Sequence, residues 1–171
     1  DCLLSRGLGD VYKRQAFFHH ADSFGMMRGG HLDICVLGAF QVSAEGDLAN
    51  WHTGAADAIP AVGGAMDLAI GAKRVFVMME HLAKDGLSKL LPACTYPVTG
   101  LRCVSRIYTE LATLDITETG VKVIELVGDT TAEHLQAVTG VALDFSALAP
   151  ASKGNLPAAR KVDEVMLELQ R

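Results

Sequence analysis

Two short apolar runs separated by a helix-like segment constrain the fold of this chain most. The runs are residues 32–37 (LDICVL) and 74–79 (RVFVMM), and between them residues 61–72 (AVGGAMDLAIGA) are small, apolar and helical in character. A β-rich apolar run of this length is typical of a strand covered on both faces. Strand, crossover helix and strand make a βαβ unit. The sequence therefore predicts an α/β fold: a mainly parallel open sheet with flanking helices.

The segments around the first predicted strand indicate a helix and a loop. Residues 21–28 (ADSFGMMR) predict a short helix, capped by Asp22 or Ser23 and ended by the glycine pair 29–30. After the strand, the polar stretch 43–54 (SAEGDLANWHTG) is expected to form a long loop.

The second half of the chain predicts a C-terminal β-hairpin and one more helix. Residues 107–116 and 121–127 indicate two strands joined through the turn at 117–120 (TETG). Residues 130–133 have capping-box spacing and predict the start of a helix that Gly140 ends.

The two ends of the chain are expected to differ from its middle. Residues 1–15 (DCLLSRGLGDVYKRQ) show no helix or strand period and look like a translated sequencing adapter, so we expect a non-native leader. Residues 16–143 are predicted to form one domain. Residues 144–171 are expected to hold a linker and an amphipathic tail helix of separate origin.

Composition excludes several classes of protein. Half of the residues are hydrophobic and mean hydropathy is +0.26, which excludes a disordered chain. A net charge of −5 gives no basic footprint for nucleic acid, and no run of apolar residues is long enough to span a membrane. The four cysteines have no metal-site spacing, and the first residues given lack the basic start, apolar run and cleavage site of a signal peptide, so none is expected. We expect a cytoplasmic protein with reduced thiols and no metal site.

Three loops could carry chemistry, because ligands of open α/β sheets bind at the carboxyl ends of strands. They are residues 38–42, directly after the first strand, the Gly63-Gly64 pair at a helix start, and Glu80-His81 after the second strand. A glycine pair at a helix start lets backbone N–H groups approach a phosphate or a thioester oxyanion. A close contact between helix and sheet explains the same pair, and both interpretations stay open.

The histidine pairs are weaker candidates. Glu80 and His81 could act as acid and base, but neighbours on an extended chain point to opposite sides, so a solvated loop pair is the favoured interpretation. His19 and His20 have the wrong spacing for joint metal ligation from one helix face.

Several separated motifs, in order along residues 17–143, resemble the B subunit of the family I coenzyme A transferases. They are FFHHADSFGMMRGGHLDICVLGAFQVSAEGDLANW, AIPAVGGAMDLAIGAKRVFVMMEH, CTYPVTG and RIYTELATLDITETGVKVIELV. Within the family, HHADSF, VLGAFQV and ANWHTG look like the 3-oxoadipate branch, which transfers CoA from succinyl-CoA to 3-oxoadipate in aromatic-compound breakdown. The acetoacetate-using branch is the alternative.

The resemblance implies a covalent mechanism and a heteromeric enzyme that also contains a CoA-transferase A subunit. A glutamate attacks the thioester and forms an anhydride, and CoA thiolate then gives a glutamyl-CoA thioester. No cofactor is needed, because the CoA thioester is a substrate. The nucleophile lies in a Glu-Asn-Gly motif upstream of the matching segment, and this sequence contains no such motif. Neither Glu45 nor Glu80 matches it, so the resemblance implies an inactive fragment.

The resemblance also assigns candidate site residues. It implies an oxyanion or CoA-binding role for Gly63 and Gly64, and places Gly38, Ala39 and Gln41 in the active-site cleft.

A dicarboxylate substrate needs a cationic or donor-rich pocket, for which the candidates are Arg28, His19, His20 and His52. Two rival classes remain: a noncatalytic module that binds CoA, and a structural protein that serves only in assembly.

Overall fold

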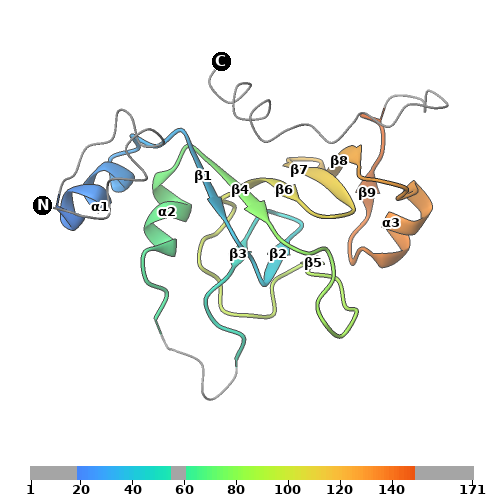
Figure 1. Cartoon of the computed structure of the whole chain (residues 1–171), viewed down its shortest axis with the longest axis horizontal. Coiled ribbons are helices and arrows are strands. Elements are labelled where there is room, and N and C mark those ends of the chain that lie inside the picture. The colour runs from blue at the N-terminus through green and yellow to red at the C-terminus, as the bar shows by residue number, and fades with distance from the viewer. Residues whose placement is uncertain (1–18, 55–60, 149–171) are drawn as a thin grey trace, which may run out of the picture.

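The computed structural model describes residues 19–54 and 61–148, which form two sheets and three helices (Figure 1). The predicted leader at residues 1–15 and the predicted tail helix lie outside these ranges. The elements are α1 (His20–Arg28), β1 (Ile34–Leu37), β2 (Gln41–Ser43), β3 (Leu48–Ala49), α2 (Ala65–Gly71), β4 (Arg74–Met78), β5 (Leu90–Leu91), β6 (Val104–Tyr108), β7 (Ala112–Thr117), β8 (Gly120–Leu126), α3 (Ala132–Val138) and β9 (Leu143–Asp144).

The larger sheet has six strands in the order β1-β4-β6-β7-β8-β9. The pairs β1–β4, β4–β6 and β8–β9 are parallel, whereas β6–β7 and β7–β8 are antiparallel. In Figure 1, α1 and α2 lie at one end of this sheet and α3 at the other. The predicted α/β class with a mainly parallel open sheet is confirmed, as are the β1-α2-β4 unit and the β7–β8 hairpin.

A second, three-stranded sheet in the order β3-β2-β5 includes Ser43, Leu48 and Ala49 of the region predicted as a long loop. The loop prediction is wrong at these residues: β2 and β3 form an antiparallel hairpin, and β2 pairs in parallel with β5. The hairpin turns at Gly46, which has a φ of +89°, a conformation that favours glycine. Strands of two or three residues are too short to show a period of two, which is why the sequence pattern indicated a loop.

The expectation of a first strand covered on both faces is also wrong within the described residues. Helix α2 lies on the face of β1 that carries Cys35, whose Sγ donates to the Leu68 carbonyl at 3.4 Å. Val36 points to the other face and is 55% exposed. From sequence alone, an edge strand with apolar residues on both faces cannot be distinguished from a strand that is covered on both faces.

The third predicted strand, residues 107–116, is in fact two strands. The chain reverses after Tyr108, where the Thr109 hydroxyl oxygen accepts hydrogen bonds from the backbone N–H groups of Leu111 and Ala112 at 3.2 and 3.0 Å. Strands β6, β7 and β8 therefore form an antiparallel meander. A threonine that closes a turn through its side chain looks like a strand residue in sequence.

The N-cap residue differs from the prediction in two helices: α1 was expected to begin at Asp22 or Ser23, and the capping-box spacing of residues 130–133 places the cap of α3 at Thr130. In α1 the N-cap is His19, whose Nδ1 accepts from the Ala21 N–H at 3.1 Å, and not Asp22 or Ser23. In α3 the N-cap is Thr131, whose side chain accepts from the His134 N–H. Both helices exist as predicted.

One core joins the two sheets, α2 and α3. Its members are apolar residues from nearly every strand, including Val42, Leu48, Val77, Leu90, Ile107, Leu114 and Leu135, each 0% exposed. The packed fold continues past residue 143, because β9 pairs with β8 and both Phe145 and Leu148 pack against the core. None of the described helices has the length and apolar character to cross a bilayer.

Candidate active site

The carboxyl ends of β1, β4 and β6 lie side by side and define the edge where a ligand of this fold class is expected. The registers pair Leu37 with Val77 and Met78 with Tyr108, so these three strands end together. The predicted cleft residue Gly38 follows β1 directly, Glu80 and His81 follow β4, and Glu110 follows β6.

Gly38 is held at this edge by an asparagine and a threonine. The Asn50 Nδ2 donates to the Gly38 carbonyl at 3.2 Å, and the Thr99 hydroxyl donates to Asn50 Oδ1 at 2.6 Å. The Asn50 backbone N–H in turn donates to the Thr99 hydroxyl oxygen at 3.3 Å. The sequence did not predict this pair, since nothing in a polar stretch marks one asparagine as the residue that closes a network.

Gln41, predicted to line the cleft, has a buried side chain that is engaged within the fold. Its Oε1 accepts from the backbone N–H groups of Thr95 and Tyr96 at 2.9 and 3.1 Å, and its Nε2 donates to the Thr95 hydroxyl oxygen at 2.9 Å. Gln41 therefore fixes the segment around Thr95 against β2. Ala39 is half-buried and packs against the core.

The two glycines at the start of α2 differ in their surroundings. Gly63 has a φ of +58°, and a β-carbon there would meet open space. Gly64 is the N-cap of α2, and a β-carbon there would lie 2.8 Å from Cζ of Phe24. The close-contact interpretation thus holds at Gly64, although the contact is with α1 and not with the sheet. An oxyanion role for Gly63 remains a prediction. Helix α2 runs back along the sheet from the end of β1 towards the start of β4. The start of α2 therefore lies at the same edge of the sheet as the end of β1 (Figure 1).

The three candidates on α1 are engaged locally. His19 caps the helix, and the His20 ring packs edge-on against Phe24 with centroids 4.8 Å apart. The Arg28 Nε donates to Asp67 of α2 at 2.7 Å, which raises the pKa of Arg28. Arg28 lies near Gly71, at the end of α2 that leads into the start of β4. The structure does not group it with Gly38.

His52, the fourth candidate, follows β3 and lies beside Trp51. Its Nδ1 accepts from the Gly54 N–H at 2.8 Å, and its ring meets Trp51 edge-on with centroids 5.2 Å apart. The Trp51 Nε1 is buried and has no hydrogen-bond partner among the described residues.

The interpretation of Glu80 and His81 as a solvated loop pair is wrong for the histidine. The Glu80 side chain is 78% exposed, whereas His81 is 0% exposed. The two side chains therefore lie in different surroundings, although they are neighbours in the chain. Burial lowers the pKa of His81, and the nearby Glu110 carboxylate opposes this shift.

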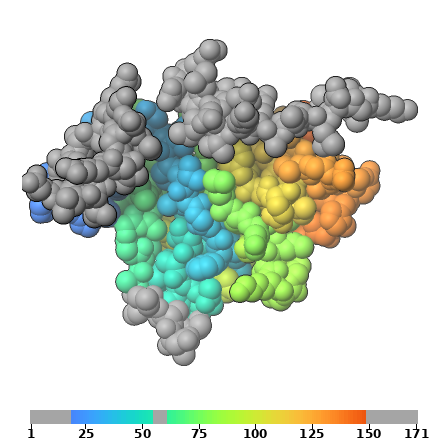
Figure 2. Space-filling view, in the orientation of Figure 1, coloured from blue at the N-terminus to red at the C-terminus, as the bar shows by residue number. Residues whose placement is uncertain are grey.

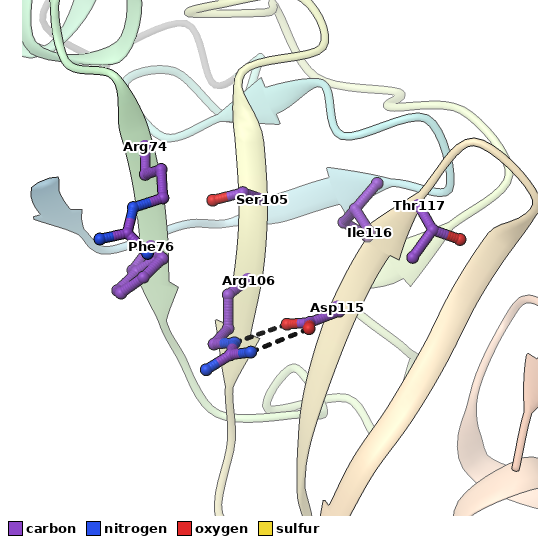
Figure 3. A pocket seen from close by; sticks show the side chains of 7 residues that line it. All are labelled: Arg74, Phe76, Ser105, Arg106, Asp115, Ile116 and Thr117. Carbon is purple, nitrogen blue, oxygen red and sulfur yellow. Dashed lines mark hydrogen bonds and ion pairs between the residues drawn. The ribbon is translucent and has the colours of Figure 1, made fainter. Parts of the chain in front are cut away.

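A separate open depression of about 220 Å³ lies on the face of the large sheet that carries Arg74, Phe76 and Arg106 (Figure 3). Arg106 donates to both carboxylate oxygens of Asp115, at 2.5 and 2.9 Å, and both arginines lie within 6 Å of the Phe76 ring, at 5.9 and 5.6 Å. None of the predicted site residues lines it.

The thiols that the structure describes are poor nucleophiles. Burial raises the pKa of Cys94 and that of Cys103 to about 11, and it raises the pKa of Cys35 as well. Among residues 19–54 and 61–148, no cluster of three or more His, Cys, Asp or Glu side chains is arranged to hold a metal ion.

Comparison with known proteins agrees with this architecture. The family model for coenzyme A transferase matches residues 4–131. The chain is 70% identical to the B subunit of 3-oxoadipate CoA-transferase from Pseudomonas putida, over 75% of its own length and 60% of that protein. It is 47% identical to the B subunit of succinyl-CoA:3-ketoacid coenzyme A transferase from Helicobacter pylori, over 65% of this chain and 53% of the relative.

Solved structures show the same fold at low identity. Glutaconate coenzyme A-transferase of Acidaminococcus fermentans superposes with a TM-score of 0.64 at 17% identity, over 78% of this chain and 60% of that one. The decarboxylase AibA/AibB gives 0.64 at 24% identity, over 86% and 64%. The chain spans about 60% of the length of the Pseudomonas relative. By its family match and its fold, this chain belongs to the coenzyme A transferases.

Proposed function

We propose that this chain is part of a CoA-transferase B subunit, which works with an A subunit to move CoA from succinyl-CoA to 3-oxoadipate. The proposal rests on how the relatives rank in their sequence identity to this chain. Identity is 70% to the protein from the 3-oxoadipate enzyme, and it falls to 47% and 43% for those from the succinyl-CoA:3-ketoacid enzymes. The reaction needs no cofactor, because the CoA thioester is itself a substrate.

The part of the site that this chain supplies is a scaffold and not a nucleophile. Asn50 and Thr99 hold the backbone at Gly38, and the left-handed turn at Gly63 faces the same edge of the sheet. Backbone groups held rigidly at that edge suit the stabilisation of an oxyanion, which forms at each attack on the thioester. The sequence has no Glu-Asn-Gly motif. The attacking glutamate would therefore have to come from outside these 171 residues.

The experiment is a chimera. Residues 16–171 are fused behind the part of the Pseudomonas putida B subunit that precedes the aligned region, and the fusion is co-expressed with the A subunit. CoA transfer from succinyl-CoA is measured with 3-oxoadipate and with acetoacetate. We expect transfer with a higher kcat/KM for 3-oxoadipate. The matched control changes the glutamate of the donated Glu-Asn-Gly motif to glutamine, which should abolish transfer. The unfused chain together with the A subunit should be inactive.

Each other result of the chimera experiment would favour a different function. A preference for acetoacetate would favour the acetoacetate-type enzyme. Binding of CoA without turnover would favour a noncatalytic binding module, and association with the A subunit without CoA binding would favour an assembly role. Turnover by the unfused chain would show that a residue within it can act as the nucleophile.

A further inference from the structure

His81 lies fully buried at a point where four segments of the chain meet. It follows β4, and its Nε2 lies 2.8 Å from the hydroxyl oxygen of Thr139 at the end of α3. Its backbone N–H donates to the carboxylate of Glu110, after β6, at 2.9 and 3.2 Å. Its carbonyl accepts from the Lys89 N–H at 3.1 Å, just before β5. One residue therefore ties α3 and β5 to the carboxyl ends of β4 and β6.

The proton on the imidazole is assigned by the hydroxyl groups that face it. The Thr139 hydroxyl donates to the Leu135 carbonyl at 2.5 Å, and the Thr109 hydroxyl donates to the Ala112 carbonyl at 3.1 Å. A hydroxyl has a single proton to donate, so neither threonine donates to the ring, and the Thr139 oxygen can accept from it. Both lone pairs of the Thr109 oxygen are already taken by the backbone N–H groups of Leu111 and Ala112, so a proton on Nδ1 would find no acceptor there. The short contact to Thr139 therefore requires a proton on Nε2. The Nδ1 lies 3.4 Å from the Thr109 oxygen and carries the lone pair in the neutral ring.

The surroundings do not stabilise a second proton enough to keep it in the fold. Water is excluded from the ring, and burial outweighs the opposing effect of Glu110, so the pKa of His81 is lowered. His134 on α3 adds to the lowering. The remaining nearby charges, Glu80 and Lys89, approach each other to 4.0 Å and largely offset one another.

Release of this contact would affect α3 first. Figure 2 shows α3 (orange) directly against the segment that follows β4 (light green). The packing is tight there, since a β-carbon at Gly140 would lie 2.7 Å from the Leu90 carbonyl oxygen. Among the described residues, Leu135 and Thr139 are the buried side chains of this helix region.

We propose that His81 is a proton-operated clamp, which holds α3 on the ends of β4 and β6 while its ring is neutral and releases α3 when it takes up a proton in acid. Uptake of the second proton favours water over the dry interior, so it is linked to opening of the contact.

The test is the pH dependence of urea unfolding of the full chain between pH 8 and pH 5. A histidine that is neutral in the folded state and protonated in the unfolded state lowers the stability of the fold as the pH falls below about 6.5. The unfolding equilibrium constant then rises by up to about tenfold per pH unit. We expect His81→Gln to remove this pH dependence and His134→Gln, at an exposed histidine on α3, to retain most of it. Equal slopes in the parent and His81→Gln would overturn the proposal.

Two further measurements keep the test decisive if His81→Gln does not fold. Thr139→Ser keeps the hydroxyl and should keep the protection of α3 from hydrogen exchange at neutral pH, whereas Thr139→Val removes the acceptor of the Nε2 proton and should lower that protection. Nitrogen NMR of the parent should show the Nε2–H tautomer at neutral pH, and hydrogen exchange in α3 should accelerate on acidification beyond the intrinsic chemical rate. A ring that titrates in its ordinary range with α3 still protected would contradict the clamp.

Discussion

The phenyl ring of Phe24 fills the space that a β-carbon at Gly64 would need, with Cζ and Cε1 at 2.8 and 2.9 Å from that position. A second glycine of α2, Gly71, meets the backbone of Met27 even more closely. The two helices are thus joined by glycines at both ends of α2, and Arg28 adds an ion pair to Asp67 between them. Each of the two glycine contacts makes a prediction about stability.

Gly71→Ala should destabilise the chain by about 2–3 kcal/mol, because the new methyl group meets backbone atoms that cannot rotate away. Gly25→Ala is the matched control. It also lies in a helix, but a β-carbon there meets nothing within 4 Å. It should stabilise the chain by up to about 1 kcal/mol, because alanine is the better helix former. Urea unfolding with an unchanged m-value measures both. Equal effects of the two substitutions would contradict the close packing.

Gly64→Ala should cost less, about 1–2 kcal/mol, since the neighbouring atoms are the far end of a side chain. In a Phe24→Leu background the space opens, and the cost of the same substitution should fall by about 1 kcal/mol or more. A double-mutant cycle gives this coupling. If the cost is unchanged, the contact with Phe24 does not explain the glycine.

Asp115→Asn should destabilise the chain by about 1–2 kcal/mol, because it breaks a bidentate pair with Arg106 on a partly covered sheet face. Asp33→Asn serves as the control. The Asp33–Lys73 pair is similarly short, at 2.7 Å, but its side chains are 78% and 64% exposed, against 25% and 35% for Asp115 and Arg106. Water and salt screen an exposed pair, so Asp33→Asn should leave the unfolding midpoint nearly unchanged. Similar losses for both substitutions, measured in urea, would refute the distinction.

Gln41→Leu should release the segment at Thr95 and Tyr96, whose N–H groups lose their acceptor. We expect their amide hydrogen exchange to accelerate by an order of magnitude or more, from the loss of about 1–3 kcal/mol of hydrogen bonding. Gln41→Glu keeps the acceptor oxygens and should preserve much of the protection. Unchanged exchange in Gln41→Leu would show that other contacts hold the segment.

Cys94 and Cys103 should react slowly with iodoacetamide at pH 8. With a pKa of about 11, only on the order of a thousandth of each thiol is ionised at that pH, and the thiolate is the reactive form. Peptide mapping should show labelling of both in guanidinium chloride and little without it. Prompt labelling of the folded chain would mean that these thiols are not shielded.

The sequence predicted the elements that have a repeated pattern or a clear end signal. The run 74–79 became β4, the segment opening on Gly63-Gly64 became α2, and the turn at 117–120 joins β7 to β8. The three-stranded sheet escaped prediction, because β3 and β5 have two residues each and owe their pairing to distant partners such as Gly100, which bridges to Leu48.

For the candidate site, the sequence predicted positions but not contacts. It placed Gly38 at a strand end, yet it could not show that Gln41 turns inward or that Arg28 is engaged by Asp67. The local sequence favours a solvated position for His81, because both it and its neighbour Glu80 are polar. The buried position of His81 involves the hydroxyl groups of Thr109 and Thr139, which lie 28 and 58 residues away in the chain. A local sequence pattern cannot predict such distant contacts.

The meander of β6, β7 and β8 has a consequence for the order of folding. Its strands are joined by turns of a few residues, whereas β1 reaches β4 only after the chain has passed through β2, β3 and α2. Closing short loops costs less chain entropy than closing long ones, and local contacts form fastest. The meander should therefore be structured early in the transition state, with high φ-values at Leu114 and Val123, and β1 should join last.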